Sequence, residues 1–309
     1  MAEESRGAVF AAMGANFAIA AGKLAAGLLT GSAALLAEAG HSFADTVNQV
    51  FLLIGLSLSE VSADERHPHG RGKEGFFWSF LAAVFIFVAG ASFSIYEGVR
   101  TLVQESEYDR SGTQLVIGFS VLGMAFLFES ISFTVATRGL LAGAKAKGWS
   151  FVRYIRESPD LTIKTVFFED SAALIGLTLA AAGLGLSEIG NSERWDGYAS
   201  VAIGVVLAGV AVMLGYQSRR LLLGTAANSE TQEAIASVLG TFPDIERTVR
   251  LLTMQLGTHS VLVTGELRVR RGLTTIEIED LLARLDIEIE AKVPEVSDTF
   301  WELRSGDKN

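Results

Sequence analysis

The sequence predicts an all-α membrane domain followed by a small soluble α+β domain. Half of its 309 residues are hydrophobic and 19% are charged, whereas an ordinary soluble domain is about 25% charged. The apolar residues form long runs before residue 217, and polar and apolar residues alternate over short distances from there on. We therefore expect a transmembrane domain at 1–216 and a soluble domain at 217–309.

Six runs of predominantly apolar residues are long enough to cross a membrane, because about 20 helical residues span about 30 Å of hydrocarbon. The predicted spans lie near residues 8–29, 33–59, 75–102, 112–137, 161–187 and 198–216. The chain contains no cysteine. Disulfides and thiolate metal sites are therefore excluded, and any transition-metal site must use histidine and carboxylate ligands.

The loops indicate how the spans are oriented. Basic residues gather after the second, fourth and sixth spans, at 66–73, 138–156 and 219–220. The alternate loops, near 30–31, 105–110 and 188–194, are neutral or acidic. Under the positive-inside rule, both termini and the soluble domain lie in the cytoplasm. The compact, Ala- and Gly-rich chain favours a prokaryotic plasma membrane. The basic residues serve topology and lipid headgroups, so we expect no nucleic acid partner.

The soluble domain is predicted to run helix, strand, strand, helix, strand, as in a ferredoxin-like α+β sandwich. Capping-box patterns at Ser229 with Gln232 and at Thr274 with Glu277 mark the two helix starts. The strands are expected at 248–256, 260–270 and 297–304, with a turn at 257–259 between the first two. An exposed sheet face or edge in such a domain favours self-association, so a homodimer is predicted.

A histidine and a carboxylate interrupt the second apolar run. His41 and Asp45 are four residues apart, so both side chains lie on one face of a helix and can chelate one ion. Charged groups in the bilayer are costly, and they usually face the bundle interior and mark an ion or proton path. The alternative is that His41 and Asp45 hydrogen-bond each other and hold helices together.

The fifth span carries the adjacent carboxylates Glu169 and Asp170. Neighbouring side chains on a helix point about 100° apart, so we expect one to be a ligand and the other a helper. Glu169 alternatively pairs with Lys164 or with another helix.

The fourth span carries one more intramembrane carboxylate, Glu129, which is a candidate for the proton path. Lys23 and Asn16 in the first span are candidates for its partner, or for donors of hydrogen bonds between helices.

These motifs together resemble the cation diffusion facilitator family of divalent-metal/proton antiporters. The resemblance rests on Gly40–Asp45 in the second span, on the loop Asp64–Glu74 with its His-Pro-x-Gly-x-x-Lys pattern, on the six spans and on the αββαβ tail, and it covers residues 8–304. The Glu169-Asp170 pair resembles a branch of the family that is associated with zinc in its eukaryotic members.

The resemblance implies a transport site made by the second and fifth spans. His41, Asp45 and Asp170 match three of the family's ligands, whereas Val166 occupies the fourth position and cannot ligate. Glu169 or water is then expected to complete the shell, with Asn48 as a possible further oxygen ligand. Zinc is the first expectation for the transported ion, and an oxygen-rich shell also suits manganese, iron or cobalt.

A second metal site is possible in the loop after the second span, at Asp64, His67 and His69. The structural alternative is a turn built on Pro68 and neighbouring glycines. In the tail, His259 is the only histidine, so a metal cluster between tails is not expected and the dimer should depend little on chelator.

We therefore predict a divalent-cation efflux transporter that exchanges Zn²⁺ for protons by alternating access as a homodimer, with no prosthetic group and no enzymatic activity. Metal ligands must lose protons to bind, which couples the two ions. The alternative of another class is a membrane protein that senses or scaffolds metal without transport. A membrane metallohydrolase is disfavoured, because the sequence has neither a His-Glu-x-x-His nor a Gly-x-Ser-x-Gly motif.

Overall fold

The computed structural model describes residues 2–104 and 110–304, with side chains from Asn16 onward. Residues 105–109, which belong to the predicted loop 105–110, lie outside the described residues. The described chain divides into two compact units. The first comprises 2–55, 77–156 and 160–218, and the second comprises 56–76, 157–159 and 219–304.

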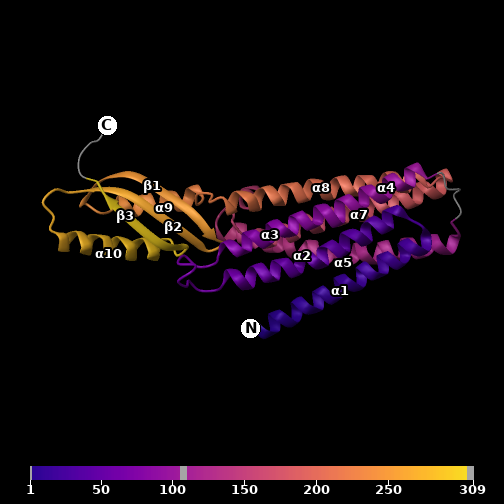
Figure 1. Cartoon of the computed structure of the whole chain (residues 1–309), viewed down its shortest axis with the longest axis horizontal. Helices are drawn as coiled ribbons and strands as arrows, with labels where there is room; N and C mark the ends of the chain where they lie inside the picture. Colours follow the sequence, from indigo (N-terminus) through magenta and orange to yellow (C-terminus); the bar gives the residue numbers. More distant parts are fainter. Residues whose placement is uncertain (1, 105–109, 305–309) are drawn as a thin grey trace. The chain divides into compact units, whose positions relative to one another are not determined.

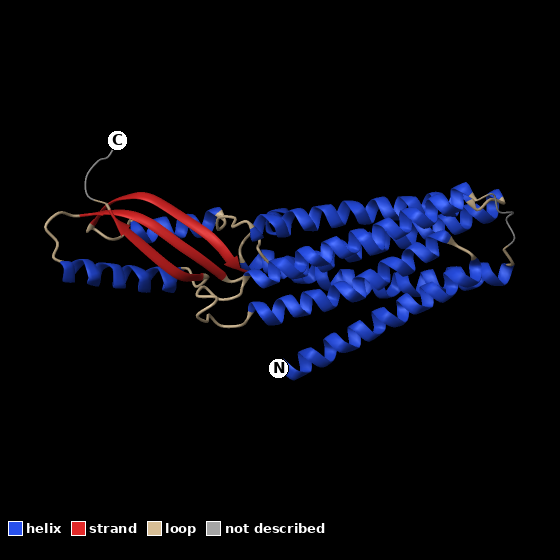
Figure 2. Ribbon diagram, in the orientation of Figure 1, coloured by secondary structure: helices blue, strands red, loops and turns tan. Residues whose placement is uncertain are grey.

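The first unit is helical (Figures 1 and 2). Its elements are α1 (Ala2–Thr30), α2 (Ala33–Ser59), α3 (Lys73–Phe85), the π-helical segment η1 (Ile86–Ala91), α4 (Ser92–Val103), α5 (Gly112–Ala146), α6 (Phe151–Glu157), α7 (Leu161–Gly190) and α8 (Arg194–Leu222). Several of these helices continue into the second unit at one end. Within the first unit, α5 packs against α7 and α1.

Four helical stretches of the described chain are long and apolar enough to cross a membrane: Lys73–Val103, Gly112–Ala146, Leu161–Gly190 and Arg194–Leu222. They contain the last four predicted spans. The predicted spans at 8–29 and 33–59 fall on α1 and α2. In α1, a shorter apolar helix is found at Asn16–Thr30. In α2, polar residues lower the hydropathy. The number of six spans therefore stays a prediction.

The core of the helical unit is built from small residues and large aliphatic ones. Its buried side chains come from several helices, and include Leu35, Leu122, Leu177, Leu184, Ile203 and Leu207. Glycines bring α4 and α8 into backbone contact, because a Cβ at Gly98 would lie 2.7 Å from the Gly197 carbonyl oxygen, and one at Gly204 would lie 2.9 Å from the Ile95 backbone nitrogen. Small residues of this kind allow close helix packing in membranes.

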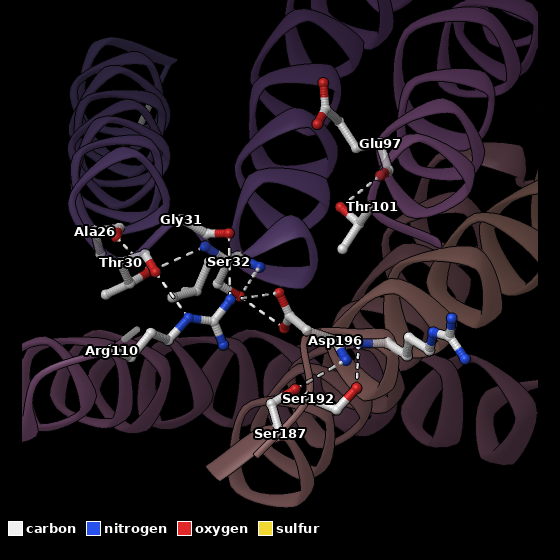
Figure 3. Close-up of polar contacts among 12 residues, drawn as sticks. Ala26, Thr30, Gly31, Ser32, Glu97, Thr101, Arg110, Ser187, Ser192 and Asp196 are labelled. Carbon is white, nitrogen blue, oxygen red and sulfur yellow. Dashed lines mark hydrogen bonds and ion pairs between the residues drawn. The ribbon is translucent and has the colours of Figure 1, made fainter. Parts of the chain in front are cut away.

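A buried ion pair joins the ends of several helices (Figure 3). Arg110 donates from Nη2 to Asp196 Oδ2 at 3.1 Å and from Nε to the Thr30 carbonyl oxygen at 2.8 Å. Ser32 Oγ donates to the other Asp196 oxygen at 2.8 Å, and the Asp196 backbone N–H donates to Ser187 Oγ at 3.1 Å. This clamp fixes the α1–α2 turn, the start of α8 and the end of α7.

The tail has the predicted order of elements, and Figure 2 shows its sheet and helices. They are α9 (Ser229–Leu239), β1 (Ile245–Gly257), β2 (Ser260–Val269), α10 (Thr275–Lys292) and β3 (Val296–Leu303). The strand order is β1-β2-β3, with β1 and β2 antiparallel and β2 and β3 parallel. The two helices and the sheet share one core, which includes Ile235, Val238, Val261, Val263, Leu267, Leu285 and Ile289.

One predicted helix start in the tail is confirmed and the other is shifted. Thr274 and Glu277 form the predicted capping box at the start of α10. The N-cap of α9 is Asn228 rather than Ser229, because the Asn228 side chain accepts from the Thr231 backbone N–H at 2.9 Å. Gln232 reaches past the cap and donates to the Ala227 carbonyl oxygen at 2.6 Å.

Candidate metal-binding site

One face of α2 carries buried polar side chains along much of its length. Glu38 and Asn48 are fully buried, His41 is 1% exposed and Ser42 is 3% exposed, and the Asp45 side chain is 14% exposed. These residues are spaced by three or four, which places them on adjacent positions of one helical face. The stripe runs inside a helix whose other residues are mostly apolar, so it faces neighbouring helices rather than lipid.

The stripe borders a small polar cavity of about 20 Å³, which is room for about one water molecule. Its wall is drawn from α1, α2, α5 and α7, through Asn16, Ile19, Ser42, Asp45, Gln49, Glu129, Val166, Glu169 and Asp170. The structure therefore brings together four carboxylates that the sequence singled out from three separate spans. Val166 lies in the same wall and offers no ligand atom.

The adjacent carboxylates of α7 have different hydrogen-bond partners although both line the cavity. Asn48 Nδ2 of α2 donates to Glu169 Oε1, so Glu169 is held by another helix, one of the two alternatives for it. Ser132 Oγ of α5 donates to Asp170 Oδ2 at 2.7 Å. Each carboxylate is thus oriented by a neighbour and retains a second oxygen.

Several buried polar atoms beside the cavity have no hydrogen-bond partner among the described residues. They are the two ring nitrogens of His41, Asp45 Oδ1, Asn48 Oδ1 and Gln49 Oε1. His41 Nδ1 lies 3.4 Å from Asp45 Oδ1, but the two do not form a hydrogen bond, which disfavours the reading of this pair as mutual glue. An unsatisfied buried polar group costs about 1–3 kcal/mol, and a bound cation would supply a partner for the carboxylate and amide oxygens and for one of the two His41 nitrogens.

The side chains of the described residues, as they stand, do not group three His, Asp or Glu residues tightly enough to hold a metal ion. His41 belongs to the stripe but is not part of the cavity wall. A site that uses His41 together with Asp45 and Asp170 therefore requires these side chains to converge when an ion binds.

A second buried ion pair lies next to this site. Lys23 of α1 donates from Nζ to Glu38 Oε2 at 3.0 Å and to Ser42 Oγ at 2.8 Å. Lys23 was a candidate partner for Glu129; its ion pair is instead with Glu38. Sequence reasoning missed Glu38, although a carboxylate three residues before His41 in an apolar run was a signal for it.

The loop after α2 is held together mainly by Asp64. Its carboxylate accepts from Arg71 Nη2 at 2.7 Å and from the backbone N–H groups of Arg66 and His67 at 2.8 and 2.7 Å. The Arg71 guanidinium, followed by the backbone N–H of His67, holds the pKa of the Asp64 carboxyl well below its usual range. These are the contacts of a structural turn, so the metal site in this loop stays a prediction.

Of the two predicted histidine ligands in this loop, one lies beside Asp64 and the other contacts β3. His67 Nδ1 lies 3.1 Å from Asp64 Oδ1, whereas His69 Nδ1 lies 3.1 Å from Asp298 Oδ2 on β3. In the tail, His259 occupies the turn between β1 and β2, as predicted. The three candidate loop ligands are therefore not gathered at one point.

Long apolar helices around a buried polar cavity are typical of an integral membrane protein. A family model identifies the family. Residues 9–223 match the model described as the cation efflux transmembrane domain. The chain belongs to the cation efflux family, which is the cation diffusion facilitator family that its motifs resemble. Its helical unit is an integral membrane domain.

Individual relatives extend this result over most of the chain. It is 31% identical over 288 residues to the human protein named proton-coupled zinc antiporter SLC30A9, mitochondrial, covering 92% of this chain and 50% of that one. It is 33% identical over 237 residues to metal tolerance protein C4 of Arabidopsis thaliana, covering 77% and 51%. It is 23% identical over 304 residues to the manganese efflux system protein MneP of Bacillus subtilis, covering 96% and 94%. The chain thus spans about half the length of the first two relatives.

Proposed function

We propose that this protein exports divalent transition-metal cations across a membrane in exchange for protons. The observation that carries the proposal is the set of buried, unpartnered polar atoms of His41, Asp45, Asn48 and Gln49 beside a cavity lined by carboxylates. Such a set is costly unless a cation or protons satisfy it. Membership of the cation efflux family supports the same conclusion.

His41, Asp45 and Asp170 are the proposed ligands, with Glu169 and Asn48 able to complete the shell. These groups bind metal only after they lose their protons, so metal entry releases protons and proton entry displaces metal. Glu129 lies in the cavity wall and is the proposed proton acceptor beside the site. Alternating access of this one site to the two sides of the membrane then yields antiport.

Zinc is the first proposed substrate, supported by the name of the human relative. Manganese is the second, for which two observations speak. The donor set around the cavity is rich in oxygen, which suits harder divalent ions, and a manganese efflux protein is among the relatives. Iron and cobalt complete the panel to be tested.

The proposed assembly is a homodimer of chains with six spans and with both termini in the cytoplasm. It divides into a transport domain at 1–216 and a dimerisation domain at 217–309. A prokaryotic plasma membrane remains our proposed location, although the human relative is named as mitochondrial.

The decisive experiment is metal flux into vesicles that contain the purified protein and carry an imposed pH gradient. Wild type should accumulate at least one of zinc, manganese, iron and cobalt, and His41→Ala, Asp45→Ala and Asp170→Ala should each reduce flux to the level of protein-free vesicles. His259→Ala, in the tail turn, is the matched histidine control and should transport like wild type.

Each rival predicts a different outcome. A metal sensor or scaffold would bind metal but show no flux with any of the four ions, which would refute transport. If flux persists in all three ligand variants, transport stands and the assignment of the site is wrong.

A further inference from the structure

A lysine lies buried beside the proposed cation site, which is an unusual place for a positive charge. Lys23 is fully buried, and its ammonium group binds Glu38 Oε2 and Ser42 Oγ. A buried charge is costly unless it is paired, and the mechanism above gives Lys23 no role. The question is what this pair does for the cavity.

The ammonium group lies one hydrogen bond away from the cavity wall. Ser42, which accepts from Lys23 Nζ at 2.8 Å, is itself one of the lining residues. Lys23 is also within electrostatic range of His41, Asp45 and Glu129. Its charge therefore acts on the atoms that the proposed function assigns to metal and protons.

Glu38 is fitted into the packing between helices. Gly176 of α7 faces it so closely that a Cβ at position 176 would collide with Glu38 Oε1. That oxygen has no hydrogen-bond partner among the described residues, so the carboxylate's contact with Lys23 is made through Oε2. Glu38 thus holds the lysine of α1 at α2, and α7 leaves room for it.

We propose that Lys23 is a fixed cation that lowers the affinity of the transport cavity for divalent metal, and that Glu38 partly offsets its charge and anchors it. This inference rests on the proposed function of the cavity. A site with several carboxylates and a histidine would otherwise hold a divalent ion too tightly to release it in each transport cycle. A nearby unit charge of the same sign weakens binding by Coulomb repulsion, which is strong in a low-dielectric interior.

Neutralising Lys23 and neutralising Glu38 should change the zinc affinity in opposite directions. Lys23→Met removes the repelling charge, and zinc should bind at least about tenfold more tightly. Glu38→Gln leaves the lysine without its offsetting carboxylate, and zinc should bind at least about tenfold more weakly. The double variant Lys23→Met/Glu38→Gln removes both charges and, because Glu38 offsets Lys23 only in part, should bind zinc more tightly than Glu38→Gln and less tightly than Lys23→Met. Lys23→Arg keeps the charge and serves as the conservative control.

The measurement is zinc binding by titration calorimetry on the purified full-length protein at one pH, with flux measured on the same variants in vesicles. For Lys23→Met we expect a lower KM for zinc together with a lower maximal rate, because release becomes limiting. A purely structural role would instead weaken binding in both single variants, since each breaks the same ion pair.

The outcomes separate this inference from the proposed function. If His41→Ala and Asp45→Ala do not change zinc binding, the cavity is not the site: the site assignment and this inference both fail, and transport is judged by the flux of the wild type alone. If they abolish binding while Lys23→Met binds zinc no more tightly than wild type, only the role of Lys23 is refuted. Should Lys23→Met fail to fold, Glu38→Gln and the double variant decide: the inference requires weaker binding in the first and its recovery in the second.

Discussion

Val166 shows how one side chain in the cavity wall bears on the choice of metal. It lies among Asp45, Glu169 and Asp170, at the position where many zinc-selective members of the resembled family carry a histidine. Val166→His would add a nitrogen ligand, and tetrahedral sites rich in histidine favour zinc. We expect zinc to bind about tenfold more tightly, with a smaller change for manganese.

Titration calorimetry with both ions measures this change in preference. Val166→Leu is the control, because it alters the volume of the side chain without adding a ligand. If the histidine and leucine variants bind the two ions alike, position 166 does not face the bound metal.

The cavity-lining residues that the sequence singled out are those whose charge stands out in an apolar run. Asp45, Glu129, Glu169 and Asp170 were predicted in this way, because an intramembrane carboxylate needs a partner or a function. Ser132 was not predicted, although it orients Asp170. A serine is common in membrane helices, and its contact depends on how α5 and α7 are rotated against each other, which one sequence does not specify.

The clamp at the helix ends is expected to carry much of the stability of the helical unit. The side chains of Arg110 and Asp196 are 2% and 0% exposed, and breaking a buried pair by removing one partner costs about 3–5 kcal/mol. Asp196→Ala removes a carboxylate that Arg110 and Ser32 share, and thermal unfolding in detergent should reveal the loss.

The ion pair of Arg100 with Glu97, in which Arg100 is half-exposed and Glu97 is buried, provides the control for this experiment. The Arg100 side chain is 50% exposed, so Arg100→Gln should cost less than about 1 kcal/mol. Equal losses in the two variants would mean that the fully buried clamp contributes no more than this partly exposed pair.

Elements were predictable where a single periodicity extends over many residues. The last four spans and the strands of the tail were located because hydropathy and alternation are properties of the chain itself. The π-helical segment at Ile86–Ala91 was not predicted, since one extra residue in a helical turn leaves no mark on the apolar run. The N-cap of α9 was shifted by one residue because Asn228 and Ser229 are both good caps.

In the proposed homodimer, two chains would associate through the exposed face of the tail sheet. Leu252, Thr264 and Phe300 lie in one row across β1, β2 and β3, and they help to line a hollow of about 330 Å³. Leu252 is 47% exposed and Phe300 is 53% exposed. Large exposed apolar side chains on one surface are typical of association sites.

Leu252→Asp and Phe300→Asp should each weaken the dimer at least about tenfold, as expected for central interface residues. Light scattering of the full-length protein over a range of concentrations measures this. Ile287→Asp, at a 67% exposed position of α10, should leave the dimer intact, and a chelator should have little effect because the tail has only His259. A dimer that dissociates on chelation would refute assembly without metal.

The glycine contacts between α4 and α8 limit how the helical unit can move. With no side chain at Gly98 or Gly204, the two backbones pack in direct contact. A hydrogen bond from Ser200 Oγ to the Ser94 carbonyl oxygen, at 2.8 Å, also joins them. If one helix moved along the other by one residue, about 1.5 Å, a side chain would clash with the backbone of the other helix at each glycine position. The cavity wall is drawn from α1, α2, α5 and α7, so if the cavity is to change sides we expect α4 and α8 to move as one unit, with the other four helices moving relative to them about the clamp that joins their ends.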